Sequence, residues 1–191
     1  MSVLLIGGST SPNSSTTRLL HHIGERLASH GHHSSRLQVR DLPAQALLHA
    51  DFKDAAIVRA LAQVAESDAV VIATPVYKAS YTGILKAFLD LLPQDGLDGK
   101  LVLPIATGGS QSHMLALDYA LRPVLASLSA RFILPSIYAT SEQLFWHPEE
   151  GLSLDAPIAS RVARGVEQLS SELFALSMRR PQLRAPLTAI A

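Results

Sequence analysis

The chain has 191 residues, of which 48% are hydrophobic and only 17% are charged. This composition supports a full apolar core and excludes an intrinsically disordered chain, and the length fits one domain. The formal net charge of +0 removes the electrostatic argument for binding nucleic acid or an anionic membrane surface. Cysteine is absent, which excludes disulfides, thiolate chemistry and iron–sulfur clusters.

Two further features bear on location and assembly. Charged residues usually make up about 25% of a chain, so part of this surface is expected to be apolar or small, as in an oligomer. The first residues, MSVLLIGG, lack the basic region of a signal peptide, and no apolar stretch approaches ~18 residues. We therefore expect a cytoplasmic protein without a transmembrane helix.

Short apolar runs alternate along the chain with longer segments of helical periodicity. Strands are predicted at 3–6, 34–39, 69–73, 101–106 and 132–139, and helices at 17–29, 51–66, 83–92, 112–130 and 157–178. In the helix at 51–66, Phe52, Ile57, Leu61 and Val64 form the predicted apolar side.

The strands are continuously apolar, which predicts a parallel sheet buried on both faces by helices. We predict an α/β fold: a flavodoxin-like, doubly wound, five-stranded sheet of order 2-1-3-4-5. Residues 1–178 form the expected domain, and 179–191 form a loosely ordered tail.

Ligands of such folds bind at the carboxyl ends of the strands, where three loops meet. The first, residues 7–17, is rich in Ser and Thr and opens directly into a helix. Backbone N–H groups and the positive end of the helix attract an anion there, which predicts a cradle for a phosphate monoester. The loop has neither the Walker nor the dinucleotide glycine pattern. The alternative is an ordinary capped turn.

The second and third loops follow the third and fourth strands. Residues 74–83 contain Tyr77 and Tyr81 behind Pro75, and this combination predicts a surface for a flat ring. Alternatively, both tyrosines pack the start of the helix or a subunit contact. Residues 107–112 contain paired glycines, which allow close approach to a ligand or simply a flexible connection. A phosphate and a flat ring together indicate a mononucleotide.

The three loops resemble those of the NADPH-dependent FMN reductases of the flavodoxin-like superfamily. The resemblance lies in Gly8-Ser9, the Ser14–Thr17 cluster, ATPVYKASYTGILKAFLDLLP at 73–93 and LPIATGGSQSHMLALDYALRPVL at 103–125. It is closest to the flavin reductases of sulfonate utilisation. It implies that NADPH reduces FMN and that the reduced flavin leaves for a flavin-dependent alkanesulfonate monooxygenase.

The resemblance also implies roles for individual residues. The phosphate would be held by Ser9, Ser14, Ser15, Thr16 and Thr17. The ring and ribityl side would be lined by Pro75, Val76, Tyr77 and Lys78. The other edge of the ring would meet Thr107, Gly108, Gly109 and Ser110.

Two positions distinguish this chain within the resemblance. Many relatives carry Arg two residues after the Gly-Ser pair, where this chain has Ser11, and Arg18 and Lys78 are the candidates to replace that cation. Tyr119 matches an inserted aromatic residue that makes a π-bulge at a subunit interface in the sulfonate-linked members. We expect the same bulge here, in a tetramer, although a plain core or surface Tyr is the alternative.

No acid or base is nominated as catalytic, because hydride transfer between stacked rings needs geometry rather than a proton donor. Five histidines, His21, His22, His30, His32 and His33, are interpreted as solvated surface rather than a metal site. His113 is expected to pack or cap the fourth helix, and contact with a ligand is the alternative. The alternatives to a flavin reductase are a quinone, azo or chromate reductase with tightly bound FMN, a flavodoxin-type electron carrier, and a flavin-free interaction module.

Overall fold

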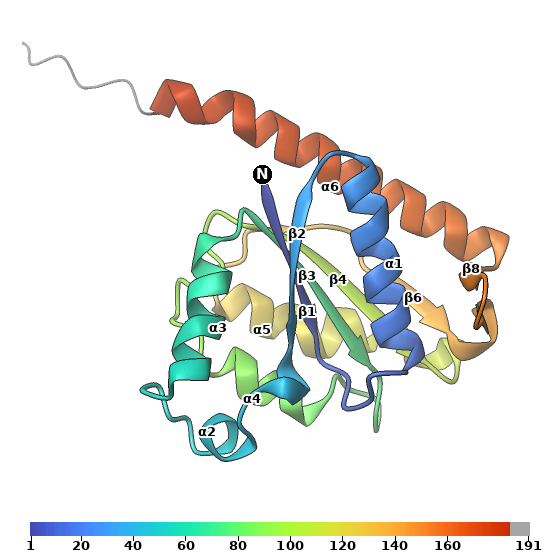
Figure 1. The fold of residues 1–191 in the computed structure, drawn as a ribbon, viewed down its shortest axis with the longest axis horizontal. Coiled ribbons are helices and arrows are strands. Elements are labelled where there is room, and N and C mark those ends of the chain that lie inside the picture. Colours follow the sequence, from blue (N-terminus) through green and yellow to red (C-terminus); the bar gives the residue numbers. More distant parts are fainter. Residues whose placement is uncertain (184–191) are drawn as a thin grey trace, which may run out of the picture.

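The protein is described by a computed structural model that covers residues 1–183 (Figure 1). Its centre is a parallel sheet of β1 (Ser2–Gly7), β2 (His33–Gln38), β3 (Ala69–Pro75), β4 (Leu101–Gly108), β5 (Phe132–Ile133) and β6 (Ile137–Thr140). The strand order is β2-β1-β3-β4-β5, and β6 also pairs with β4. The predicted fold class and strand order are confirmed.

Alternate side chains of each strand enter different layers. Leu4 and Ile6 of β1 belong to one apolar cluster, and Val3 and Leu5 belong to another. The first cluster is completed by α3 (Ala55–Glu66), α4 (Gly83–Leu89) and α5 (Arg122–Ser127). The second is completed by α1 (Ser15–Ser29) and α6 (Ala156–Leu183). Helices therefore cover both faces, as Figure 1 shows.

The fifth predicted strand, at 132–139, is interrupted. Residues 134–136 separate β5 from β6, and Pro135 lies in this gap. Proline has no N–H to give to a ladder, so it is disfavoured inside a central pairing. Both pieces still run parallel to β4, at Leu101↔Phe132 and Ile105↔Ile137.

The predicted helix at 51–66 begins later, at Ala55. Asp54 caps it, because its Oδ1 accepts hydrogen bonds from the N–H groups of Ala56 at 2.7 Å and Ile57 at 3.2 Å. Phe52 therefore lies outside the helix and is 56% exposed, so its assignment to the apolar side was wrong. A short helix that was not predicted, α2 (Ala44–Leu48), precedes this segment.

The predicted helix at 112–130 is built from three pieces. They are a 3-10 turn, η2 (Gln111–His113), a π-helical turn, η3 (Leu117–Leu121), and α5. Tyr119 lies in the π-helical turn, where the expected bulge is found. Pro123 occupies the first turn of α5, where its missing N–H is tolerated.

The chain between β6 and α6 forms a hairpin that was not predicted. It consists of η4 (Ser141–Gln143), β7 (Leu144–His147) and β8 (Gly151–Leu154), and β7 and β8 pair antiparallel. A further 3-10 turn, η1 (Val39–Asp41), follows β2. Helix α6 continues past Met178, the predicted end, to Leu183, and the part of the predicted tail from 184 to 191 lies outside the described residues. Within residues 1–183, none of the helices combines the length and the apolar character needed to cross a membrane.

Candidate functional site

The loops that follow β1, β3 and β4 meet at the carboxyl edge of the sheet. They meet because the three strands are neighbours in register, with Gly7 opposite Ala73 and Pro75 opposite Thr107. Each of the three loops contains residues that the sequence placed in a ligand site. Hydrogen bonds between the loops fix their relative positions.

Gly8 and Thr82 connect the first loop to the second. The N–H of Gly8 donates to the carbonyl of Ala73 at 2.8 Å, and the buried hydroxyl of Thr82 donates to the carbonyl of Gly8 at 2.6 Å. The same hydroxyl accepts from the N–H of Leu85 and so caps α4. A Cβ at Gly8 would lie 2.9 Å from Cβ of Leu85, so only glycine allows the loop to lie this close to α4.

Thr107 connects the third loop to both of the others. Its hydroxyl is hydrogen-bonded to the hydroxyl of Thr16, in the first turn of α1, and both side chains are buried. Its carbonyl accepts from the N–H of Val76 at 2.8 Å. The three loops therefore form one hydrogen-bonded unit, although they are far apart in the sequence.

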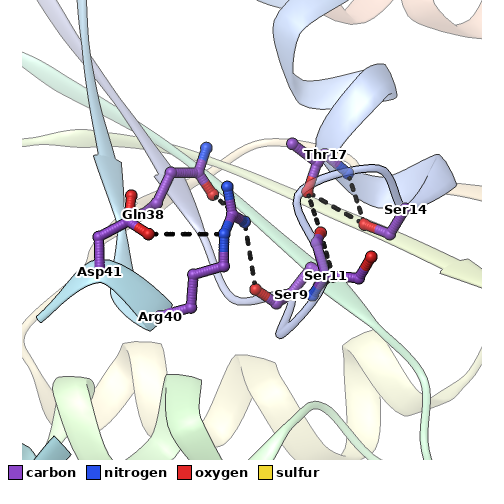
Figure 2. A network of polar contacts seen from close by, with 7 residues as sticks. All are labelled: Ser9, Ser11, Ser14, Thr17, Gln38, Arg40 and Asp41. Atoms are coloured by element: carbon purple, nitrogen blue, oxygen red, sulfur yellow. Dashed lines mark hydrogen bonds and ion pairs between the residues drawn. The ribbon is translucent and has the colours of Figure 1, made fainter.

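The hydroxyl groups of the first loop fold it around the start of α1 (Figure 2). Ser14 is the N-cap: its Oγ accepts from the N–H of Thr17 at 3.1 Å. The hydroxyl of Thr17 donates to the carbonyl of Ser11 at 3.1 Å, and the buried Oγ of Ser9 accepts from the N–H of Ser11 at 3.2 Å. Ser15 is the first residue of α1, where helical N–H groups have no intrahelical acceptor.

Arg40, which the sequence did not identify, places its guanidinium against this loop. It lies in η1 and donates from Nη1 to the carbonyl of Ser9 at 3.3 Å (Figure 2). The two candidates from the sequence lie elsewhere. The guanidinium of Arg18 lies 4.2 Å from the centre of the Trp146 ring, and Lys78 is exposed in the second loop. Arg40 could have been noticed because it follows β2, whose end lies at the same edge.

The second loop projects as a tight turn. Tyr77 and Ser80 exchange two backbone hydrogen bonds, at 2.9 and 3.1 Å, around Lys78 and Ala79. Lys78 has φ of 50° and Ala79 of 60°, in the left-handed region that glycine occupies at least cost. Pro75 is buried at the end of β3, Val76 is half-buried, and the ring of Tyr77 is 53% exposed. This turn therefore presents an aromatic ring next to the site.

Tyr138, on β6, contacts the third loop and holds it in place. Its hydroxyl donates to the carbonyl of Ser110 at 2.6 Å, and a Cβ at Gly108 would lie 2.2 Å from that hydroxyl oxygen. Burial raises the pKa of Tyr138, so the hydroxyl stays protonated and remains a donor. Gly109 and Ser110 are exposed, and a Cβ at Gly109 would meet nothing within 4 Å. Only Gly108 of the pair is sterically required.

A cavity of about 270 Å³ lies between the second loop and the helical segment after the third. Its lining includes Ala79, His113, Leu115 and Tyr119, and the side chain of Tyr119 is 79% exposed. His113 is exposed in η2 rather than packed. Met114 and Leu115 are also exposed, so the π-helical turn lies beside an apolar surface.

Of the five histidines interpreted as solvated surface, His30 and His33 are exposed, and the other three are half-buried. His21 and His22 lie in the middle of α1, which begins at Ser15, and they line a second cavity of about 410 Å³ against the β7–β8 hairpin. Burial is the main cause that lowers the pKa of both. His32 bonds to Ser170 of α6 at 2.7 Å. Among the described residues, no three His, Asp or Glu side chains are grouped so as to hold a metal ion.

The described edge fits a flavin mononucleotide in its chemistry. The first loop offers hydroxyl and helix N-terminal N–H groups, which suit a phosphate monoester. Glycine at positions 8 and 108 allows the first and third loops to pack closely, because a Cβ at either position would collide with a neighbouring side chain. The second loop adds an exposed aromatic ring. A neighbouring cation, Arg40, complements the negative charge of a phosphate.

Comparison with known proteins agrees with this chemistry. The sequence model of the family described as "NADPH-dependent FMN reductase" matches residues 1–144. An "FMN reductase (NADPH)" of Pseudomonas putida strain KT2440 is 43% identical over 97% of this chain and 93% of its own length. An "FMN reductase (NADPH)" of Escherichia coli K12 is 40% identical over 75% of each chain. A solved structure described as "NADH:FMN oxidoreductase (EMOB) - apo form" superposes with a TM-score of 0.82, at 38% identity, over 90% of this chain and 89% of its own.

Proposed function

The chain belongs to the NADPH-dependent FMN reductase family, and we propose that it reduces FMN with NADPH at the edge formed by the three loops. The observation that carries this proposal is the hydrogen-bonded union of those loops through Gly8, Thr82, Thr16 and Thr107. A site that must align two flat rings needs walls that do not move relative to one another. These buried bonds supply such walls.

In this proposal the first loop holds the flavin phosphate. Ser9, Ser14, Ser15, Thr16 and Thr17 contribute in different ways: Ser14 and Thr17 shape the loop, Thr16 anchors it to Thr107, and Ser15 lies at the helix N-terminus. Pro75, Val76, Tyr77 and Lys78 line one side of the ring. Thr107, Gly108, Gly109 and Ser110 line the other edge.

The bound flavin supplies the ring that accepts a hydride from the nicotinamide, and the chain supplies binding, orientation and exclusion of water. The loops contain no carboxylate or histidine between residues 7 and 17 or between 74 and 83. This agrees with a reaction in which no side chain transfers a proton.

We further propose that the reduced flavin leaves for a flavin-dependent monooxygenase that acts on organosulfonates. The motifs at 73–93 and 103–125 support this proposal through their resemblance to the sulfonate-linked reductases. A tetramer with Tyr119 at a subunit interface belongs to the same proposal. Its support is the 79% exposure of Tyr119 on a π-helical turn beside exposed Met114 and Leu115.

The test is oxidation of NADPH followed at 340 nm by stopped flow, with and without added FMN. We expect slow oxidation without FMN and a saturable increase with it, and a larger kcat/KM for NADPH than for NADH. Oxidation that is fast without added FMN, by a protein that keeps its flavin through gel filtration, would favour the reductase with tightly bound flavin. Absence of steady-state oxidation with a stable semiquinone would favour an electron carrier.

A further inference from the structure

Arg40 joins three residues at the base of the first loop (Figure 2). Its Nη1 donates to the carbonyl of Ser9 at 3.3 Å and to Oε1 of Gln38 at 2.9 Å, and its Nε lies 3.6 Å from the carboxylate of Asp41. The Arg40 side chain is only 17% exposed, whereas that of Asp41 is 71% exposed. The guanidinium is therefore fixed against the loop, and its acidic partner is largely in solvent.

The surrounding sequence is arranged around this guanidinium. A Cβ at Gly7 would lie 2.1 Å from Oε1 of Gln38, so glycine at position 7 makes room for the amide that holds Arg40. The other end of that amide, Nε2 of Gln38, is buried without a hydrogen-bond partner among the described residues. A buried unpaired donor costs stability. The oxygen of the Gln38 amide thus accepts a hydrogen bond from Arg40, while its nitrogen has no partner among the described residues.

The loop that Arg40 touches has no charge of its own. Residues 7–17 read GGSTSPNSSTT and contain no Lys, Arg, Asp or Glu. The phosphate of FMN carries close to two negative charges at neutral pH. A partly buried guanidinium is screened less than an exposed one, so it attracts this group over a longer distance.

We propose that Arg40 is a positioning and specificity residue, which fixes the first loop through Ser9 and supplies the positive charge that makes the site select a phosphorylated flavin over riboflavin. The inference rests on the proposed function, because it places the FMN phosphate in the first loop. It adds that the selecting charge comes from Arg40, in the 3-10 turn that follows β2, and that Ser11, Arg18 and Lys78 do not supply it.

The test compares the Kd values of FMN and riboflavin, measured by quenching of flavin fluorescence, in the wild type and four variants. In R40Q, the Kd of FMN should rise about tenfold and that of riboflavin less than about twofold. R40K keeps the positive charge but not the forked set of hydrogen-bond donors, so its Kd for FMN should rise less than that of R40Q. D41N removes the neighbouring negative charge from an exposed side chain and should tighten FMN about twofold.

Arg59→Gln is the matched control. Arg59 is exposed on α3 and lines a cavity with Gln38 and Asp41, so the variant makes the same change of charge nearby without the contact to Ser9. It should change the ratio of the two Kd values less than twofold. Thermal unfolding of each variant shows whether it is folded. If R40Q does not fold, the FMN affinity of D41N tests the electrostatic part of the inference.

Three results would overturn the inference. If R40Q loses the same affinity for FMN as for riboflavin, Arg40 has only a structural role. If R40Q raises the KM of NADPH and leaves the Kd of FMN unchanged, the charge of Arg40 acts on NADPH and not on FMN. An unchanged or weaker affinity for FMN in D41N would contradict the electrostatic argument. If the wild type itself does not distinguish FMN from riboflavin, the phosphate cradle is wrong and the inference fails with it, whereas NADPH oxidation upon addition of FMN tests the proposed function separately.

Discussion

Replacing the threonine pair Thr16 and Thr107 by valine tests the bond that joins the first loop to the third. The two hydroxyls bond to each other, and their side chains are 1% and 4% exposed. Valine has nearly the same shape as threonine, so each single variant mainly removes a hydroxyl. The remaining partner is then buried without a hydrogen bond, at a cost of about 1–3 kcal/mol in the free energy of unfolding.

The double variant is expected to behave differently from the sum of the singles. When both hydroxyls are replaced by methyl groups, no polar group is left unpaired, and the change can be nearly neutral. We therefore expect a coupling of at least about 1–3 kcal/mol, with the double variant no less stable than either single one. Because the loops lose their polar link, its Kd for FMN should nevertheless rise above that of the wild type.

The assay is equilibrium unfolding in urea of the wild type, both singles and the double, with flavin fluorescence titrations alongside. The m-value should stay constant, since the surface exposed on unfolding does not change. A second cycle on Lys86 and Asp90, an exposed i,i+4 pair at 2.6 Å, is the control, with an expected coupling of about 0.5 kcal/mol or less. Additive losses in T16V and T107V would refute the reasoning, because they would mean that each hydroxyl is satisfied independently.

Three further predictions concern the second and third loops and the π-helical turn. G108A should lower the free energy of unfolding by about 1–3 kcal/mol and weaken FMN binding, because its Cβ would meet the Tyr138 hydroxyl at 2.2 Å. G109A should match the wild type in the urea titration, because a Cβ there would meet nothing within 4 Å. A79G should raise the free energy of unfolding by about 1 kcal/mol, since Ala79 has a φ of 60°. Its control, A62G, lies in the exposed middle of α3 and should lower the free energy of unfolding. Thermal melts in which both variants shift the melting temperature in the same direction would contradict this. Deletion of Tyr119 should restore a regular helix and lower the oligomer mass or the FMN affinity, as measured by light scattering and titration, and an unchanged mass and affinity would count against the interface.

The sequence was sufficient for the layers of the fold because the strands are short, apolar and regularly spaced. Val3 to Ile6 and Ala69 to Ala73 predict strands buried on both faces, and such strands leave few arrangements other than a doubly wound sheet. Ends of elements were less predictable. The helix at 51–66 was placed too early because the apolar Phe52 continued the helical pattern, whereas the side chain of Asp54 ends that pattern by capping Ala56 and Ile57.

The hairpin of β7 and β8 shows a different limit. Each strand has four residues, and Phe145 and Trp146 of β7 are about half exposed, so no alternation of buried and exposed side chains marks them. The pairing depends instead on Gly151, the first residue of β8, which has a φ of 81°, and on packing beside α1. That packing also explains why His21 and His22 are half-buried and line a cavity.

In the candidate site too, features that follow from the local sequence pattern could be predicted, and features that depend on spatial contact could not. Loop positions follow from strand order, so the Ser and Thr residues of the first loop and the glycines of the third could be assigned to one edge. Contacts between loops could not, because Thr16 and Thr107 are 91 positions apart and nothing in either segment specifies the other. Arg40 is the sharpest case. A search near the Gly-Ser pair looks for a cation at position 11 or 18, whereas a parallel sheet brings the end of β2 as close to the first loop as the loop's own sequence neighbours. Where a residue type is missing from a phosphate loop, the strand that pairs with the loop's own strand is therefore a physically justified place to look for its replacement.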